Sequence, residues 1–461
     1  MSRAAASPAR PRHAALGVAA AFCLLLLGGC REFEAHRDRL SEVVGSGRFD
    51  IAAAMLDDPA TRERYGARND LLWKLDRGAV ALAMDDPDTA IALLNDAEAQ
   101  VELERKNAGD TASQWLLNDT AAKYIAAPYE DLYINALKLL AQLQAGRVQG
   151  GATVEARRAA GKADLLRDLY TKQSSAAEAQ ARSRGASVSG PRGMPVEEAG
   201  EFVESPLTTF LSAVTFMKSG EREYQRVAGK RLIDSIRIQR GLIGPVREED
   251  FAGLDELDPA SVNVLVVGLS GRGPTKFAQR IGPIPIGTLP VYFELPYLRT
   301  YRSEVAGVRV EVESGTSGAA QTLDRLKLVE DLSSVATVNH NRTLPLIYQR
   351  TLVRYMLKAG ASIALTEMGR RSARDRDQGL IQLAGVLAGL AYLGATEQAD
   401  LRCWIFLPGQ ARVGLLKLPP GEHRIRTVFE GAGGGAVYAS PWRTVRVTEN
   451  GLSTVVTQYW R

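Results

Sequence analysis

The stretch Gly268–Lys276 carries residue types that could bind a phosphate. It follows an apolar run and combines three glycines with Ser270, Thr275 and Lys276. In a phosphate-binding loop the lysine directly follows the second glycine, so that backbone N–H groups and the ammonium converge on the phosphates. Here Pro274 takes the lysine position and removes an N–H group. We therefore expect a glycine-proline hairpin or crossover loop, and we predict no nucleotide or other cofactor.

Metal ligands and catalytic groups are sparse. His36, His340 and His423 are far apart in the sequence and lack a His-x-x-x-His spacing or a cysteine partner, and His340 between two asparagines is typical of a polar turn. The glycine after Ser270 comes one position too early for a nucleophile elbow. We interpret the conspicuous carboxylates as helix caps and solvated surface: Asp85, Asp86, Asp88, Glu330 and Asp331. The sequence predicts no metal site and no catalytic residue.

Cys30 follows a segment with the features of a secretory leader. Three arginines and a histidine precede the apolar stretch Ala14–Leu27, which is shorter than the roughly 20 residues that a spanning helix needs. We predict a removable signal peptide at residues 1–29; an uncleaved N-terminal anchor is the alternative. The ending Leu27-Gly28-Gly29-Cys30 resembles the lipobox of bacterial lipoproteins. That resemblance implies that the leader is cleaved before Cys30 and that lipid is attached to Cys30. In that family an Asp after the cysteine is the inner-membrane retention signal, and Arg31 takes its place here, which implies that the protein is anchored in the outer membrane and faces the periplasm.

The remaining chain is nearly neutral. The formal net charge of +4 falls to about +1 once the three arginines of the leader are removed, so we expect no nucleic-acid partner. The chain has three cysteines: Cys23 lies in the leader, Cys30 is the expected site of lipid attachment, and Cys403 is the third. Cys403 lies in an apolar, strand-like run, which favours a buried thiol over a reactive one.

Residues 30–245 have the apolar spacing of amphipathic helices and predict an α-helical domain. Within it, Gly78, Ala90, Leu94 and Ala97 have the spacing of a tetratricopeptide repeat, where small residues lie at the closest approach of two helices. Weaker copies surround this repeat, and stacked repeats form a curved layer with a concave groove. A plain helical domain is the alternative. Residues 174–204, rich in Ser, Gly and Ala, predict a mobile insertion.

The second half changes to short β-branched runs separated by Gly and Pro. Residues 246–399 predict a mixed α/β region, whose apolar helix at 380–393 is too short to span a membrane. Residues 400–461 predict a small antiparallel, β-sandwich-like region in which Asn450-Gly451 joins Arg443–Val447 to Thr454–Thr457 as a hairpin. The fold class is α+β and multidomain.

Several segments together resemble a family of bacterial lipoproteins with tetratricopeptide-like repeats: residues 27–30, 73–78, 90–98, 117–119, 129–130, 155–158, 273–276 and 400–408. We expect a lipid-anchored scaffold or assembly factor of the cell envelope, not an enzyme, that docks a protein partner in its helical groove. The alternative is a module that binds peptidoglycan or polysaccharide through aromatic rings: Tyr292, Tyr297, Tyr301, Trp404, Trp442 and Trp460. An envelope hydrolase is a third possibility.

Overall fold

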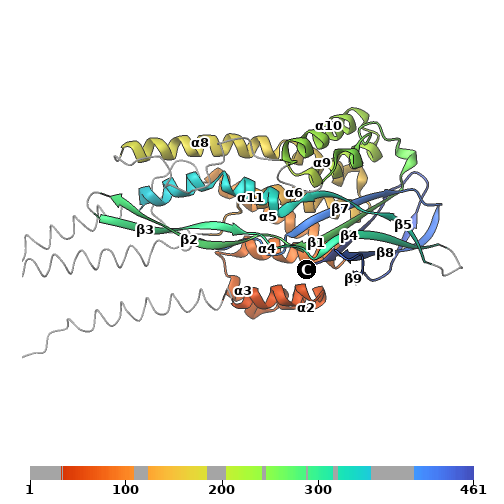
Figure 1. Cartoon of the computed structure of the whole chain (residues 1–461), viewed down its shortest axis with the longest axis horizontal. Coiled ribbons are helices and arrows are strands. Elements are labelled where there is room, and N and C mark those ends of the chain that lie inside the picture. Colours follow the sequence, from red (N-terminus) through yellow and green to blue (C-terminus); the bar gives the residue numbers. More distant parts are fainter. Residues whose placement is uncertain are drawn as a thin grey trace, which may run out of the picture.

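The structure, a computed structural model, describes residues 33, 35–107, 123–183, 204–240, 246–286, 289–314, 320–354 and 399–461. The expected signal peptide, Cys30 and the helix at 380–393 lie outside these residues. The fold is mixed α/β, with helices in the first half and several sheets in the second (Figure 1). The first half contains helical residues 35–45, α2 (Phe49–Asp57), α3 (Pro59–Tyr65), α4 (Asp70–Ala83), α5 (Pro87–Asn107), α6 (Pro128–Gln144), α7 (Thr153–Ala160), α8 (Lys162–Ser183), α9 (Pro206–Ser219) and α10 (Arg222–Gln239).

Local sequence explains how these helices start and stop. The carboxylate of Asp86 accepts a hydrogen bond from the Thr89 N–H at 3.1 Å, so it caps α5 at the turn after α4. Ser205 caps α9 in the same way, accepting from the Thr208 N–H, with Pro206 as the first helical residue. Gly220 ends α9 with a φ of 83°, a backbone conformation that favours glycine. Short turns therefore join α4 to α5 and α9 to α10, and the two helices of each pair pack against each other.

Helix α8 is longer than expected. It extends to Ser183, so the loop predicted for residues 174–204 is wrong over residues 174–183. Four alanines between Ala176 and Ala181 explain the difference, because alanine has the highest helix propensity. Of the rest of this insertion, only Glu204 lies within the described residues. Within the described part of the chain, no helix is long and apolar enough to cross a membrane.

Within its described residues, the second half contains two sheets and a separate hairpin. Its strands are β1 (Val264–Arg272), β2 (Thr275–Ile286), β3 (Leu289–Arg299), β4 (Val305–Ser314), β5 (Ala320–Arg325), β6 (Lys327–Asp331), β7 (Pro408–Leu416), β8 (Gly421–Gly431), β9 (Ala436–Ala439), β10 (Arg443–Val447) and β11 (Ser453–Tyr459). Sheet A has the order β11-β1-β7-β6, and sheet C the order β10-β8-β4-β5, with β9 paired to β8. Strands β2 and β3 pair with each other. Helix α11 (Leu332–Asn341) and helical residues 344–354 follow β6.

The expected hairpin through Asn450-Gly451 is wrong. Strand β10 pairs antiparallel with β8, whereas β11 runs parallel to β1, with Val266 opposite Val455. Both Val455 and Val456 are buried although they point to opposite faces of the strand. A two-stranded hairpin cannot cover both faces, so β11 joins sheet A instead. The C-terminal strands thus form no sheet of their own and enter sheets that contain β1 and β4.

Sheet A lies between the helices and sheet C. On one side, Val264 and Val266 of β1 pack in an apolar cluster with Val308, Val310 and Phe429 of sheet C. On the other side, the alternate residues Leu265, Val267 and Leu269 belong to a cluster that extends through the helices. Strand β1 is buried on both faces, which explains its continuous apolar run.

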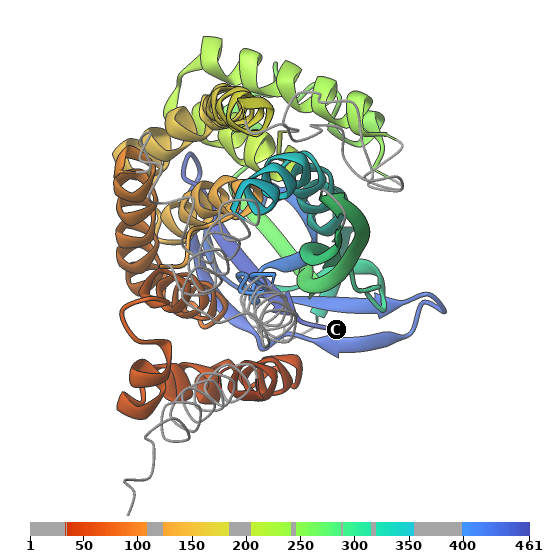
Figure 2. The same ribbon diagram turned by 90° about the vertical axis from the view of Figure 1, so that its left-hand side faces the viewer.

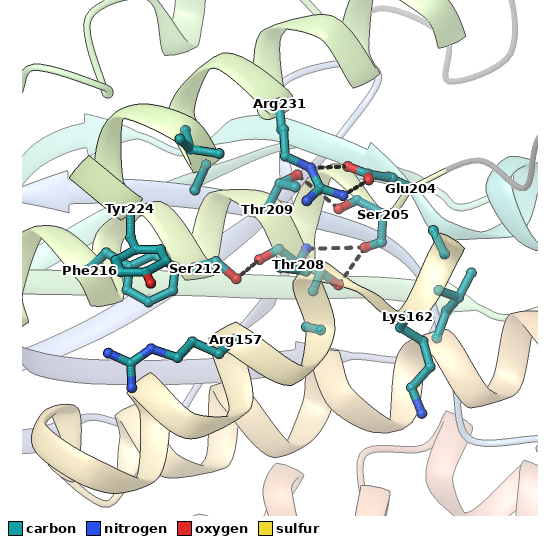
Figure 3. A pocket seen from close by; sticks show the side chains of 16 residues that line it. Arg157, Lys162, Glu204, Ser205, Thr208, Thr209, Ser212, Phe216, Tyr224 and Arg231 are labelled. Carbon is teal, nitrogen blue, oxygen red and sulfur yellow. Dashed lines mark hydrogen bonds and ion pairs between the residues drawn. The ribbon is translucent and has the colours of Figure 1, made fainter. Parts of the chain in front are cut away.

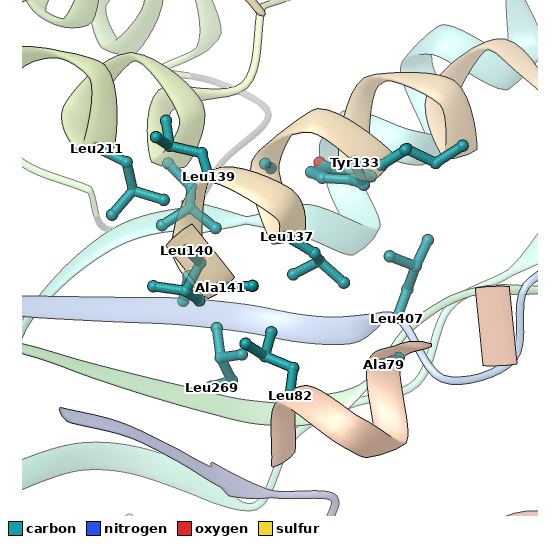
Figure 4. Packing of buried hydrophobic residues seen from close by; sticks show 14 of the residues in the cluster. Ala79, Leu82, Tyr133, Leu137, Leu139, Leu140, Ala141, Leu211, Leu269 and Leu407 are labelled. Atoms are coloured by element: carbon teal, nitrogen blue, oxygen red, sulfur yellow. The ribbon is translucent and has the colours of Figure 1, made fainter. Parts of the chain in front are cut away.

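The helical half and sheet A share one core. Leu82 of α4, Leu140 of α6, Leu211 of α9 and Leu269 of β1 belong to the same buried cluster (Figure 4). Helix α6 is buried from Tyr129 to Leu143, so it has no solvent-exposed face there. Viewed along the long axis, the helices form an arc around the strands (Figure 2). The three regions expected from the sequence are therefore not separate cores, and the chain's own strands cover the inner side of the helical arc.

Candidate functional site

An apolar pocket lies between two groups of helices, α6–α8 on one side and α9–α10 on the other (Figure 3). Its volume is about 300 Å³. Six of its 16 lining residues are alanine, valine or leucine: Leu132, Ala159, Ala160, Ala163, Val227 and Ala228. Pockets of this kind, with an apolar wall and polar groups at a few positions, are typical of binding sites.

The hydroxyl groups of the pocket bond to the chain itself. Ser212 donates to the Thr208 carbonyl oxygen at 2.8 Å, and Thr209 donates to the Ser205 carbonyl oxygen at 3.0 Å. Thr208 donates to the Ser205 hydroxyl at 2.9 Å. These bonds follow from the position of the side chains in the first turns of α9, where hydroxyls reach carbonyls three or four residues back. The donors are occupied, which favours an apolar ligand over a polar one.

The cations around the pocket are also paired. Arg231 makes a two-pronged contact with the Glu204 carboxylate, and Arg157 pairs with Glu221 across the rim. The Lys162 ammonium lies 2.8 Å from an oxygen of Asp131. Because each positive charge already has a carboxylate partner, the pocket presents little net charge to a ligand.

Aromatic rings form one end of the pocket. The rings of Phe216 and Tyr224 lie 5.3 Å apart, and the Arg157 guanidinium lies 5.5 Å from the centre of the Tyr224 ring. Tyr224 is 52% exposed and Val227, on the next turn of α10, is 51% exposed. Large apolar side chains of this exposure beside a hollow are typical of a contact surface.

Behind the pocket lies a buried ion network that joins α5, α6, α7 and α8. The Lys138 ammonium, fully buried, lies 2.5 Å from Glu98 and 3.0 Å from Glu155. Lys162 lies 3.5 Å from Glu98, and Asn135 donates to the same carboxylate at 2.7 Å. Burial alone would raise the pKa of Glu98, but the hydrogen bond and charge of Lys138 outweigh it and lower that pKa to about 2. The network therefore keeps the Glu98 carboxylate ionised and holds together the helices that form the pocket wall.

A second buried carboxylate, Glu330 of β6, connects sheet A to the helices. It accepts hydrogen bonds from the hydroxyls of Tyr133 and Ser205, each at 2.6 Å, and from the Leu207 N–H at 2.8 Å. Burial raises its pKa to about 7, although these donors act in the opposite direction. The expectation that Glu330 lies on the surface is wrong, whereas its neighbour Asp331 caps α11 through the Ser334 N–H as expected.

The four repeat residues lie at the interface of α4 and α5. A Cβ added to Gly78 would lie 3.0 Å from Leu94, so the two helices approach closely at this point. Ala90, Leu94 and Ala97 are fully buried in the same core. The structure does not bring them into the pocket, and Cys30 lies outside the described residues. These four residues thus pack α4 against α5 and do not line this pocket.

Candidate catalytic groups are separated or occupied. Ser270 is buried in β1, where its hydroxyl accepts a hydrogen bond from Arg412 at 3.1 Å. The Lys276 ammonium donates to the Arg402 carbonyl oxygen, away from any phosphate cradle. Contrary to the turn expected for it, His340 lies in α11, and burial lowers its pKa to about 4. No group of three or more His, Cys, Asp or Glu residues suited to a metal occurs in the described ranges.

Two of the six proposed glycan-binding rings are internal, and so is the thiol of Cys403. Trp404 and Trp460 are buried, so neither can present a face to a sugar. The Trp442 ring lies 4.4 Å from the Arg426 guanidinium. Cys403 is buried, as expected, and burial raises the pKa of its thiol. The six rings therefore do not form one shared surface.

Sequence reasoning missed both buried networks and the pocket. A signal was present in α6, where Glu130, Asp131 and Lys138 interrupt a helix that is apolar on every side. Charges on such a helix must be buried, and a buried charge needs a partner. The identity of the partners was not visible, because Glu98 lies 40 residues before Lys138.

Comparison of the chain with protein-family models, with curated proteins and with solved structures finds no match.

Proposed function

We propose that the chain is a lipid-anchored scaffold or assembly factor of the cell envelope, which docks an amphipathic helix of a partner protein. The docking site is the apolar pocket between α6–α8 and α9–α10. The lipobox-like ending at Cys30 supports the anchor, and the paired helices support a repeat-type interaction layer. The role is one of binding and placement, without a chemical step.

The observation that carries this proposal is an apolar pocket with exposed apolar residues at its rim. Tyr224 and Val227 stand beside a wall of alanines, while the surrounding cations and hydroxyls already have partners within the chain. A neutral, apolar side chain can enter without leaving a buried charge unpaired, whereas a charged ligand finds no free counter-charge among these groups. About 300 Å³ is at the lower end of the roughly 300–1,000 Å³ of ligand pockets, which favours a few anchoring side chains.

The position of the pocket also fits a helix as the ligand. It lies between packed helices, and a helix laid into such a groove presents anchors at i, i+3, i+4 and i+7. The concave inner side of the helical arc, where a repeat protein usually binds, is covered here by sheet A. We therefore assign docking to this pocket and not to the inner groove. A lipid anchor would add to the affinity, because it raises the effective concentration of a partner in the same membrane.

Two substitutions on α10 test the docking surface. Val227→Asp places a charge at the pocket rim, where it would have to be desolvated by a bound helix. Ile238→Asp is the matched control, because Ile238 is 76% exposed on the same helix and lies outside the pocket lining. The full-length protein is captured with its partners from chemically crosslinked cells. We expect the wild-type and Ile238→Asp proteins to retain the same specific partner and Val227→Asp to lose it.

Equal capture by all three proteins would refute docking in the pocket. Absence of any specific partner in the wild-type sample would refute the scaffold function itself. Mass spectrometry of the mature N-terminus tests the anchor separately, since an unmodified sulfur at Cys30 would exclude it.

A further inference from the structure

A second cavity, of about 310 Å³, lies where α5, α6 and α8 meet α11, the helical residues 344–354 and the base of β2 and β3. Helices α8 and α11 lie side by side in both views of the molecule (Figure 1, Figure 2). The segments that form the lining are far apart in the sequence and include Val101, Leu166, Lys276 and Leu346. None of its lining residues belongs to the pocket between α6–α8 and α9–α10, so the two hollows are separate.

The inner wall of this cavity is apolar. Ten of its 21 lining residues are alanine, valine, leucine, isoleucine or proline. Val101, Leu166 and Leu346 among them are only 4%, 6% and 5% exposed, so they line the inside of the protein and not its outer surface. Ile125, which is 56% exposed, lies at the rim. A wall of this kind favours an apolar chain as the ligand, because binding removes that chain from water.

The charged groups of the lining favour a negative charge on that ligand. The lining includes three carboxylates and four cations, the latter being Arg105, Lys123, Lys276 and Arg350. Each carboxylate already contacts a cation of the chain: Glu104 contacts Lys123, Asp131 contacts Lys162 and Asp400 contacts Arg402. Because the carboxylates are occupied, a cationic ligand finds no ready partner among them, whereas an anionic ligand meets an excess of positive charge.

Lys276 supplies the charge that such a ligand would contact. Its ammonium is half-buried, donates to the Arg402 carbonyl oxygen at 2.8 Å and lies 6.0 Å from the centre of the Tyr124 ring. It forms no ion pair with a carboxylate of the described residues. An ammonium has three N–H groups, and the carbonyl oxygen uses one of them. The other two can donate to a negatively charged group, and such bonds are stronger than those between neutral groups.

The ring of His340 adds an uncharged polar group to the same lining. It is 1% exposed, and its Nε2 atom lies 2.7 Å from the Pro296 carbonyl oxygen. A carbonyl oxygen only accepts hydrogen bonds, so Nε2 carries the proton and Nδ1 keeps its lone pair. Burial lowers the pKa of His340 to about 4, so the ring is neutral at neutral pH. Nδ1 has no hydrogen-bond partner among the described residues, which leaves a buried acceptor in a side chain of the lining.

We infer that this cavity binds a fatty acid, with the acyl chain against the aliphatic wall and the carboxylate at Lys276. The ammonium donates to the carboxylate, and the acyl chain has no polar group that would need a partner in the cavity. A volume of about 310 Å³ is at the lower end of the range of ligand pockets, which suits one acyl chain better than the two chains of a phospholipid. The inference goes beyond the proposed scaffold function and depends neither on the anchor at Cys30 nor on the docking pocket.

Binding of decanoate to the mature chain tests the site. Residues 30–461 are prepared without acylation, so that no detergent competes, and decanoate and decanol are compared by isothermal titration calorimetry. We expect the wild type to bind decanoate about tenfold more tightly than decanol, the order of one hydrogen bond to a charged group. Lys276→Met keeps the apolar stem and should bind both ligands with the same, weaker affinity. Lys218→Met is the matched control, because Lys218 is also half-buried and donates to the carbonyl oxygens of Pro259 and Val262, outside the cavity.

Ile347→Trp separates binding inside the cavity from attraction to a surface charge. Ile347 lines the cavity, so a larger side chain there should weaken decanoate and decanol alike. Circular dichroism checks that each variant is folded. Equal decanoate affinity of the wild type and a folded Lys276→Met protein overturns the carboxylate site, and unchanged affinity of Ile347→Trp overturns the cavity as its place. If Lys276→Met does not fold, the wild type decides, because binding without a preference for decanoate over decanol overturns the inference, as does the absence of binding.

Discussion

Glu330 offers the sharpest test of how the helices are joined to sheet A. Its carboxylate is fully buried and has hydrogen bonds to Tyr133, Ser205 and the Leu207 N–H. Burial raises its pKa from 4.5 to about 7, despite those donors. Glu330→Gln keeps the shape of the side chain and removes the ionisation. A glutamine oxygen can still accept from Ser205, and its NH₂ group can donate to the Tyr133 oxygen.

The sign of the pH dependence follows from the direction of the shift. Because the folded pKa is above the unfolded value, the stability that Glu330 contributes is complete below 4.5 and is lost as the pH rises through about 7. A shift from 4.5 to about 7 makes the wild-type protein lose roughly 2 kcal/mol of unfolding free energy through this group between about pH 5.5 and about pH 8. The glutamine variant has no such loss.

Urea unfolding of both proteins at these pH values measures the difference. Two other buried groups also change the stability with pH. Burial raises the pKa of Asp76 to about 7, so Asp76 lowers the stability as the pH rises, as Glu330 does. Burial lowers the pKa of His340 to about 4, so His340 has the opposite effect. Both are present in each protein, so their effects cancel when the curves are subtracted. Parallel curves for wild type and variant would refute the reasoning, since they would show that Glu330 stays ionised over the whole range.

Two further predictions concern the helical layer. Lys138→Met removes the fully buried cation that the carboxylates of Glu98 and Glu155 share and should cost about 3–5 kcal/mol in urea unfolding. Loss of the exposed Arg147 pair by Arg147→Ala should cost less than about 1 kcal/mol, and equal effects would contradict the buried network. Gly229→Ala should destabilise the protein by about 1–3 kcal/mol, because the new Cβ would lie 2.7 Å from the Asp255 backbone. Gly45→Ala is the control, because a Cβ at Gly45 would meet open space. Thermal unfolding measures both, and a Gly229→Ala protein as stable as the wild type would count against that contact.

The helices could be predicted from the sequence because their determinants are local. Apolar spacing, Pro87 at the start of α5 and Gly220 at the end of α9 all act within a few residues. The last two strands were predicted in place but not in partner: Asn450-Gly451 favours a hairpin, yet burial of β11 on both faces pairs it with β1. The strand-like run around Cys403 is not a strand, although the thiol is buried. Which strands pair is decided by the shape of the whole core, and sequence proximity is a weak guide to it.

The candidate site was less predictable than the fold. The pocket depends on how α9 and α10 sit against α7 and α8, which single helices do not specify. The pairing of Lys138 with Glu98 and Glu155 depends on the same packing. The concave groove predicted inside the helical layer is filled by sheet A, which occupies the inner side of the arc. The sequence does not show this position of the sheet.

The place of β11 at the edge of sheet A has a consequence for biogenesis. Its partner β1 is synthesised about 190 residues earlier, as the pairing of Val264 with Ser453 shows. During synthesis, the earlier strand and the helical surfaces that rest on this sheet emerge well before their last neighbour, and contacts so distant along the chain form slowly. Apolar surface is then uncovered for the whole of that delay, which is when a polypeptide aggregates. The order of emergence therefore favours chaperones that bind the unfinished chain until β11 is available to pair with β1.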